Sequence, residues 1–144
     1  MSGHIFFADR YFGYDDAIYA SCRLAEIFSK RRLQEPSVRI SSLLSGLPIT
    51  CATPEIRNDC PDAKKFEVID NLSEIIGQRH SGSPVIRDII KIDGLRLIFD
   101  YGWALVRASN TQPILVLRFE ATTEKWLTEI KRFVEDLLKT VIKE

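Results

Sequence analysis

Residues 103–120 read WALVRASNTQPILVLRFE, and the predicted organisation of the second half of the chain follows from this segment. Two apolar runs, 104–106 and 114–117, lie on either side of a polar segment, as expected of two strands joined by a loop. The polar segment holds four donor-bearing side chains, those of Arg107, Ser109, Asn110 and Thr111. Because donors clustered on a tight loop suit an anion with several oxygens, the stretch predicts a phosphate-binding loop.

The same loop also has a simpler interpretation. In a polar hairpin turn, Ser109 and Asn110 would hydrogen-bond to their own backbone and bind no ligand. Two features suit a phosphate: Arg107 ends a predicted strand, which fixes its position, and Asn110 tolerates the left-handed backbone that a phosphate-binding nest requires. The chemistry of the loop alone leaves both interpretations open.

The residues around the loop predict a four-stranded antiparallel meander. Strands are expected at 85–92, 95–100, 103–107 and 114–121, and the last, richest in apolar residues, is expected to be interior. Asp93-Gly94 is a typical two-residue hairpin turn. Trp103 is expected to pack in the core.

Two helices are expected to flank this sheet, which makes the fold class α+β. The first runs from Asp62 to about Arg79. The second follows Thr122 or Thr123 as its N-cap. The expected apolar face of the first helix comprises Ala63, Phe66, Ile69, Leu72, Ile75 and Ile76. The expected apolar face of the second comprises Leu127, Ile130, Val134, Leu137, Leu138 and Val141.

The first third of the chain is predicted to be mostly helical. Asp15 is expected to cap a helix that extends to about Lys30, and a second helix is expected to begin at Pro36. Residues 48–61 contain three prolines and no clean periodicity, which indicates a linker. We therefore expect three parts: a helical segment over 1–47, a hinge or linker over 48–61, and the α+β domain over 62–144.

Composition narrows the classes of function. Lys+Arg and Asp+Glu both number 20, so the formal net charge is zero, which disfavours a nucleic-acid partner. Cys22, Cys51 and Cys60 lack C-x-x-C or ligand-like spacing, so we expect free thiols and no metal site. No apolar run approaches the ~20 residues of a membrane span, and no signal-peptide pattern begins the chain. The expected location is the cytoplasm, with no membrane partner.

The longer run DGLRLIFDYGWALVRASNTQPILVLRFEA, residues 93–121, resembles the C-terminal domain of the α-D-phosphohexomutases, the phosphomannomutase/phosphoglucomutase group. In that family an R-x-S-N-T-x-P loop grips the phosphate of the sugar substrate. Residues 1–27, MSGHIFFADRYFGYDDAIYASCRLAEI, are similar to the end of the family's third domain, where an E-x-S-G-H loop recognises sugar hydroxyls. The resemblance thus implies phosphate binding by the loop residues from Arg107 to Thr111, and sugar contact by Ser2 and His4.

The departures from the family pattern are as informative. The chain has neither a T-A-S-H-N-P-like serine loop nor a D-G-D-G-D-R metal loop, although full-length members use Mg²⁺. The resemblance therefore implies a hexose-phosphate-binding C-terminal part, with residues 1–47 left from an α/β domain, no catalytic residue, and no isomerase activity by itself. The alternatives are a stand-alone phosphate-ligand module and a protein-interaction module from a split or degenerate gene, with or without a companion chain.

Overall fold

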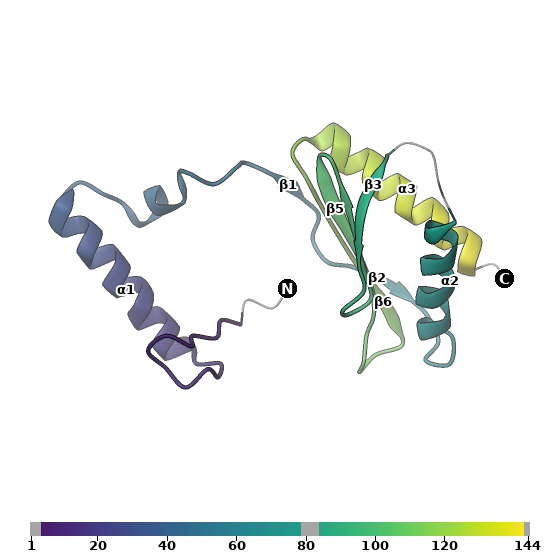
Figure 1. The fold of residues 1–144 in the computed structure, drawn as a ribbon, viewed down its shortest axis with the longest axis horizontal. Coiled ribbons are helices and arrows are strands. Elements are labelled where there is room, and N and C mark those ends of the chain that lie inside the picture. Colours follow the sequence, from purple (N-terminus) through teal and green to yellow (C-terminus); the bar gives the residue numbers. More distant parts are fainter. Residues whose placement is uncertain (1–3, 79–83, 143–144) are drawn as a thin grey trace. The chain divides into compact units, whose positions relative to one another are not determined.

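The predicted meander is present in the computed structural model, which describes residues 4–78 and 84–142. Its strands are β3 (Ile86–Ile90), β4 (Leu95–Phe99), β5 (Gly102–Ala108) and β6 (Ile114–Ala121), each antiparallel to the next (Figure 1). A register shift between Ile86 and Asp88 interrupts the β3–β4 ladder, which indicates a β-bulge.

The sheet has six strands, so the prediction of four was wrong in number. The additional strands are β1 (Cys51–Ala52) and β2 (Ile56–Asp59), within the segment that we expected to be a linker. Both pair antiparallel with β6, which is therefore interior as predicted. Without them, β6 would expose a row of unpaired N–H and C=O groups along an apolar edge. The prolines did not prevent this pairing, because Pro54 lies between the two strands and Pro61 follows the second.

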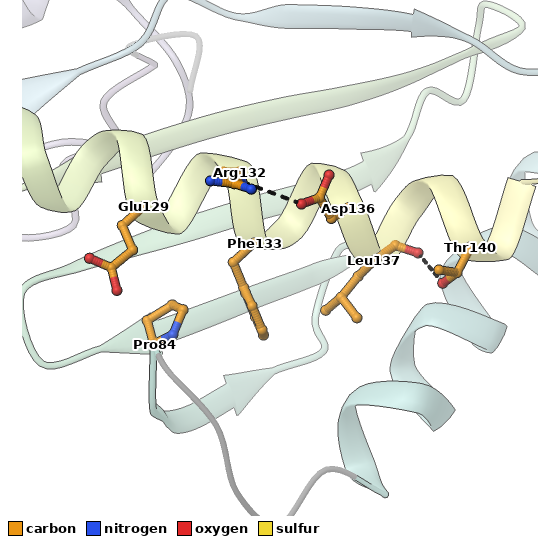
Figure 2. A pocket seen from close by; sticks show the side chains of 7 residues that line it. All are labelled: Pro84, Glu129, Arg132, Phe133, Asp136, Leu137 and Thr140. Atoms are coloured by element: carbon orange, nitrogen blue, oxygen red, sulfur yellow. Dashed lines mark hydrogen bonds and ion pairs between the residues drawn. The ribbon is translucent and has the colours of Figure 1, made fainter.

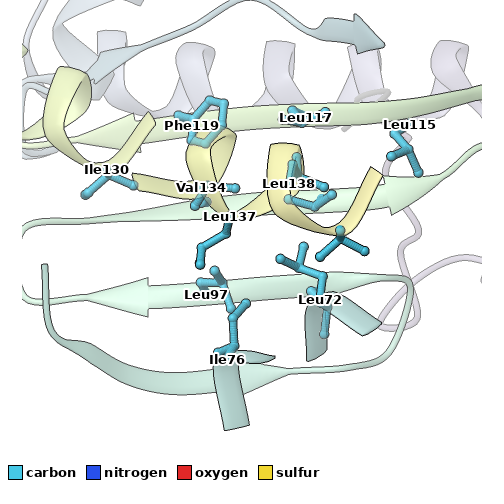
Figure 3. Packing of buried hydrophobic residues seen from close by; sticks show 14 of the residues in the cluster. Leu72, Ile76, Leu97, Leu115, Leu117, Phe119, Ile130, Val134, Leu137 and Leu138 are labelled. Atoms are coloured by element: carbon cyan, nitrogen blue, oxygen red, sulfur yellow. The ribbon is translucent and has the colours of Figure 1, made fainter. Parts of the chain in front are cut away.

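Helices α2 (Lys65–Gly77) and α3 (Glu124–Ile142) cover one face of the sheet (Figures 1 and 3). The apolar face predicted for α3 is confirmed in full, since the same six residues are buried. Thr123 caps this helix through a 3.3 Å hydrogen bond that its Oγ1 accepts from Trp126 N. The core between the layers is dominated by large aliphatic side chains and Phe119, which is fully buried. The α+β class is confirmed.

Helix α2 buries part of its predicted apolar face: Leu72 and Ile76 are buried, and Ile69 and Ile75 are partly buried and pack against the core. Its buried residues are Lys65, Val68, Leu72 and Ile76, whereas Phe66 is 54% exposed. Each buried residue lies three or four positions after the previous one, so the stripe is helical but begins with a charged side chain. The prediction listed apolar residues only and included neither Lys65 nor Val68.

Trp103 lies on the face of the sheet that carries no helix in the described residues, not in the core. It is the register partner of Glu120, one position away from the buried pair Ala104 and Phe119, and successive residues alternate between faces. The ring is half-buried beneath the guanidinium of Arg96, whose Cζ is 4.6 Å from the ring centroid.

The N-terminal unit, Met1–Leu47, is separate from the unit Pro48–Glu144. Its main element is α1 (Ala17–Gln34), capped by Asp16 rather than by the predicted Asp15. The helix expected from Pro36 is a 3-10 helix, Ile40–Leu44. No residue of α1 is buried, so hydrogen bonds and ring contacts, rather than an apolar core, hold the preceding segment against it.

One of these contacts perturbs a carboxyl group. Arg10 Nη2 donates a 2.6 Å hydrogen bond to Glu26, and Lys30 donates another of 2.7 Å. The two cations lower the pKa of Glu26 to about 2, with the hydrogen bond from Arg10 as the larger cause.

Within the described residues, no helix combines the length and the hydropathy that a membrane span requires.

Candidate functional site

The predicted anion-binding loop, residues 109–113, joins β5 to β6. Arg107 is the penultimate residue of β5 and is paired in register with Val116, so the sheet fixes its backbone. Its side chain is 40% exposed, and its Nη1 lies 3.1 Å from Asp93 Oδ2. Arg107 thus presents a partly exposed guanidinium that one exposed carboxylate already contacts.

Ser109 organises the loop backbone. Its N–H donates to Ile114 O at 3.0 Å, and its Oγ accepts hydrogen bonds from Thr111 N and Gln112 N at 3.3 and 3.2 Å. This agrees with the simpler interpretation, in which a turn serine bonds its own backbone. It also leaves the hydroxyl proton of Ser109 available as a donor, because the oxygen only accepts in these contacts.

Asn110 and Thr111 are exposed at the tip of the loop. Among the described residues, no hydrogen bond involves the backbone N–H or the side chain of Asn110, or the hydroxyl of Thr111. The expectation of a left-handed Asn110 is wrong, since every positive φ in the described residues belongs to a glycine. The loop therefore offers side-chain donors and the Asn110 N–H, rather than a left-handed nest.

Lys65, the first residue of α2, contacts the loop, and the sequence interpretation missed it. It is the one buried charged residue among those described, with 4% exposure. Its Nζ donates to Asp62 Oδ1 at 2.6 Å and to the carbonyl oxygen of Gln112 at 3.2 Å. Cys60 N also donates to Pro113 O at 2.8 Å. These hydrogen bonds connect the second half of the loop to Lys65 at the start of α2 and to Cys60, which follows β2. The one signal of Lys65 in the sequence was its helical spacing from Val68.

The sugar-contacting residues predicted at the N-terminus belong to the other unit. Ser2 lies outside the described residues. His4 is exposed, and its Nδ1 contacts the carboxylate of Asp15. His4 belongs to the unit Met1–Leu47, and the loop belongs to the unit Pro48–Glu144.

The described residues do not fit a magnesium site. No group of three or more His, Cys, Asp or Glu side chains among residues 4–78 and 84–142 is arranged to hold a metal ion. We therefore assign no metal to the loop.

A groove of about 370 Å³ lies elsewhere, along the exposed side of α3 (Figure 2). It is lined by Pro84, Glu129, Arg132, Phe133, Asp136, Leu137 and Thr140. Three of its polar side chains are engaged with near neighbours: Arg132 Nε lies 3.7 Å from Asp136 Oδ2, and Thr140 Oγ1 donates to Leu137 O. None of the predicted site residues lines it.

Comparison with known proteins supports the resemblance seen in the sequence. Residues 55–137 match the family described as phosphoglucomutase/phosphomannomutase, C-terminal domain. The chain belongs to this family. The matched segment contains the loop 109–113, β2–β6 and α2.

Relatives extend the similarity over nearly the whole chain. A phosphomannomutase/phosphoglucomutase from Pseudomonas aeruginosa is 43% identical over 141 residues, and a phosphoglucomutase from Neisseria meningitidis is 45% identical over 132 residues. The crystal structure of a phosphoglucomutase/phosphomannomutase family protein from Burkholderia thailandensis is similar with a TM-score of 0.78 at 36% identity, covering 98% of this chain.

The chain spans only about a quarter of the length of these proteins: 28% of the Pseudomonas protein, 26% of the Neisseria protein and 27% of the Burkholderia chain.

Proposed function

We propose that the unit Pro48–Glu144 is the part of a phosphomannomutase/phosphoglucomutase that binds the phosphate group of a hexose phosphate. The observation that carries this proposal is the placement of Arg107. A guanidinium at the end of an interior strand adjoins a loop whose tip presents unengaged donors, in a chain that belongs to this family.

The chemistry of the loop suits a phosphate monoester. A guanidinium can donate two parallel hydrogen bonds to two phosphate oxygens, which is the strongest contact of this kind that a side chain offers. The hydroxyl protons of Ser109 and Thr111 and the amide of Asn110 can donate to the same anion. In the family, this loop holds the phosphate group of the substrate that is not being transferred. Its binding would therefore orient the substrate rather than transform it.

We infer that the chain does not isomerise sugar phosphates by itself. It contains no T-A-S-H-N-P-like serine loop and no D-G-D-G-D-R metal loop. In the family's reaction a phosphoserine transfers phosphate to the sugar. The role left to this chain is to hold the other phosphate while a companion chain or further domains supply the chemistry. Closure of that combined cleft would exclude water.

An amide NMR titration of the full chain with glucose 1-phosphate and mannose 1-phosphate, with sulfate as a comparison anion, tests the proposal. We expect saturable shifts at residues 107–111 and a Kd in the millimolar range, roughly 4 kcal/mol of binding free energy. Arg107→Ala should abolish these shifts. The matched control is Arg87→Ala, since Arg87 is an exposed, ion-paired strand arginine near the opposite end of the sheet. A flat titration on a folded sample would contradict autonomous phosphate binding.

One observation favours the alternative of an interaction module. The helix α1 buries no residue within its own unit, and Ile18 and Leu33 are 79% and 86% exposed. Apolar residues exposed on one helix suit a protein contact. Light scattering of the chain, and of Ile18→Asp, tests this use: a concentration-dependent dimer lost in the variant supports it, and a monomer at every concentration argues against it.

A further inference from the structure

Asp93 lies in the turn between β3 and β4, at the same end of the sheet as the loop 109–113. Leu95 pairs in register with Val106, so the residues that precede β4 lie beside the end of β5. Asp93 Oδ2 accepts a hydrogen bond from Arg107 Nη1 at 3.1 Å. The carboxylate is thus a ready-made anionic partner for the arginine that we assign to phosphate.

The position of this carboxylate is set by the backbone. Gly94, the next residue, has a φ of 79°, a conformation that residues with a Cβ rarely adopt. A Cβ at Gly94 would lie 2.4 Å from Val106 O and 2.7 Å from Arg107 Cα. The turn therefore packs directly against the backbone of Arg107, which keeps Asp93 within reach of the guanidinium.

The contact holds Nη1 of the guanidinium on the β4 side of Arg107. In the sheet, β5 lies between β4 and β6. Asp93 precedes β4, whereas Asn110 and Thr111 lie on the connection to β6. For Arg107 to donate two parallel hydrogen bonds from Nη1 and Nη2 to an anion that the loop donors also bind, Nη1 would have to release Asp93.

We propose that Asp93 is an internal competitor for Arg107, which holds the arginine until a phosphate displaces the carboxylate. This inference rests on the proposed function. The side chains of Asp93 and Arg107 are 63% and 40% exposed, and exposed ion pairs are weak. The apparent affinity for phosphate then equals the intrinsic affinity multiplied by the fraction of molecules in which Arg107 is not paired with Asp93.

The test is the affinity of the full chain for glucose 1-phosphate in Asp93→Asn. Asparagine keeps the size and turn preference of aspartate but removes its charge. We expect the Kd to fall about 2–5-fold, because a weak competing pair is removed. The matched control is Asp59→Asn. Asp59 is exposed, pairs in register with Ile114 at the end of the loop, and forms no ion pair with a described residue.

The control separates competition from a general electrostatic effect. If both variants tighten binding equally, the field of nearby carboxylates explains the result and the inference is overturned. It is also overturned if binding depends on Arg107 but Asp93→Asn leaves the Kd unchanged or weakens it. If no variant shows Arg107-dependent shifts, the proposed function itself fails. A larger gain in Asp93→Asn than in Asp59→Asn, lost when Arg107→Ala is added, supports the inference.

Discussion

Replacing Lys65 by methionine tests whether the buried ammonium group supports the loop. Methionine retains an unbranched apolar side chain of similar length, so the packing of the lysine stem is largely kept. The change removes the hydrogen bonds from Nζ to Asp62 and to Gln112 O. The control is Lys64→Met, the same replacement at the exposed preceding residue.

The magnitude follows from the two lost contacts. A hydrogen bond that involves a charged group contributes about 1.5–3 kcal/mol. Removing a buried ammonium also recovers part of its desolvation free energy, which offsets some of this loss. Because Asp62 is exposed and regains water, we expect a net decrease in the free energy of unfolding of about 1–2 kcal/mol, or about 4–16 °C in Tm for a domain of this size. Lys64→Met should change stability by less than about 0.5 kcal/mol.

Urea unfolding followed by tryptophan fluorescence measures this decrease. Both tryptophans, Trp103 and Trp126, lie in the unit Pro48–Glu144, so the signal reports that unit alone. The amide signals of the loop 109–113 should also shift in Lys65→Met and not in the control. Equal stability of the two variants would refute the assignment of a supporting role to Lys65.

Three further predictions concern packing, protonation and thiol reactivity. In urea unfolding, Gly102→Ala should destabilise the sheet by about 1–3 kcal/mol, because its Cβ would lie 2.3 Å from a β6 carbonyl oxygen. The Cβ of Gly77→Ala would meet nothing within 4 Å, so this variant should raise stability by up to about 1 kcal/mol. The pKa of Glu26 is lowered to about 2 from a usual 4.5 by the cations that donate to it, so its stabilising contribution is complete above about pH 4.5 and is lost as the pH falls toward 2. The α1 amide signals should report this loss, and Glu26→Gln should remove it. Burial raises the pKa of the Cys60 thiol, so a thiol reagent followed by mass spectrometry should modify the exposed Cys22 first and Cys60 only on unfolding.

The fold of the second half of the chain was largely predictable, because strong local patterns dictate it. The position of β6 follows from a continuous apolar run, and the buried face of α3 follows from apolar residues with a period near 3.6. The two strands within residues 48–61 were not predictable in this way. Both are short, three of the four residues of β2 are polar, and prolines lie two residues from their ends. They form because β6 offers an unpaired edge, which is a property of the folded sheet.

The candidate site was predictable only in part. The loop donors are adjacent in sequence, so their grouping was visible without a structure. Lys65 and Asp93 were missed as members of the site because each reaches it from a distant part of the chain: Lys65 is 47 residues from Gln112, and Asp93 is 14 residues from Arg107. Contacts of this kind depend on strand register and helix phase, which single-sequence patterns do not fix.

The two edges of the sheet differ, and the difference bears on self-association. One edge consists of the two short strands β1 and β2, which pair only with β6 among the described strands, and the other edge is β3, which pairs only with β4. That edge carries the bulge between Ile86 and Asp88, together with two charged residues at 87 and 88. Bulges and charges on an edge strand discourage the docking of a second strand. The chain therefore disfavours edge-to-edge growth into fibres by two means: one edge is divided into two very short strands, and the other is interrupted by a bulge and carries charges.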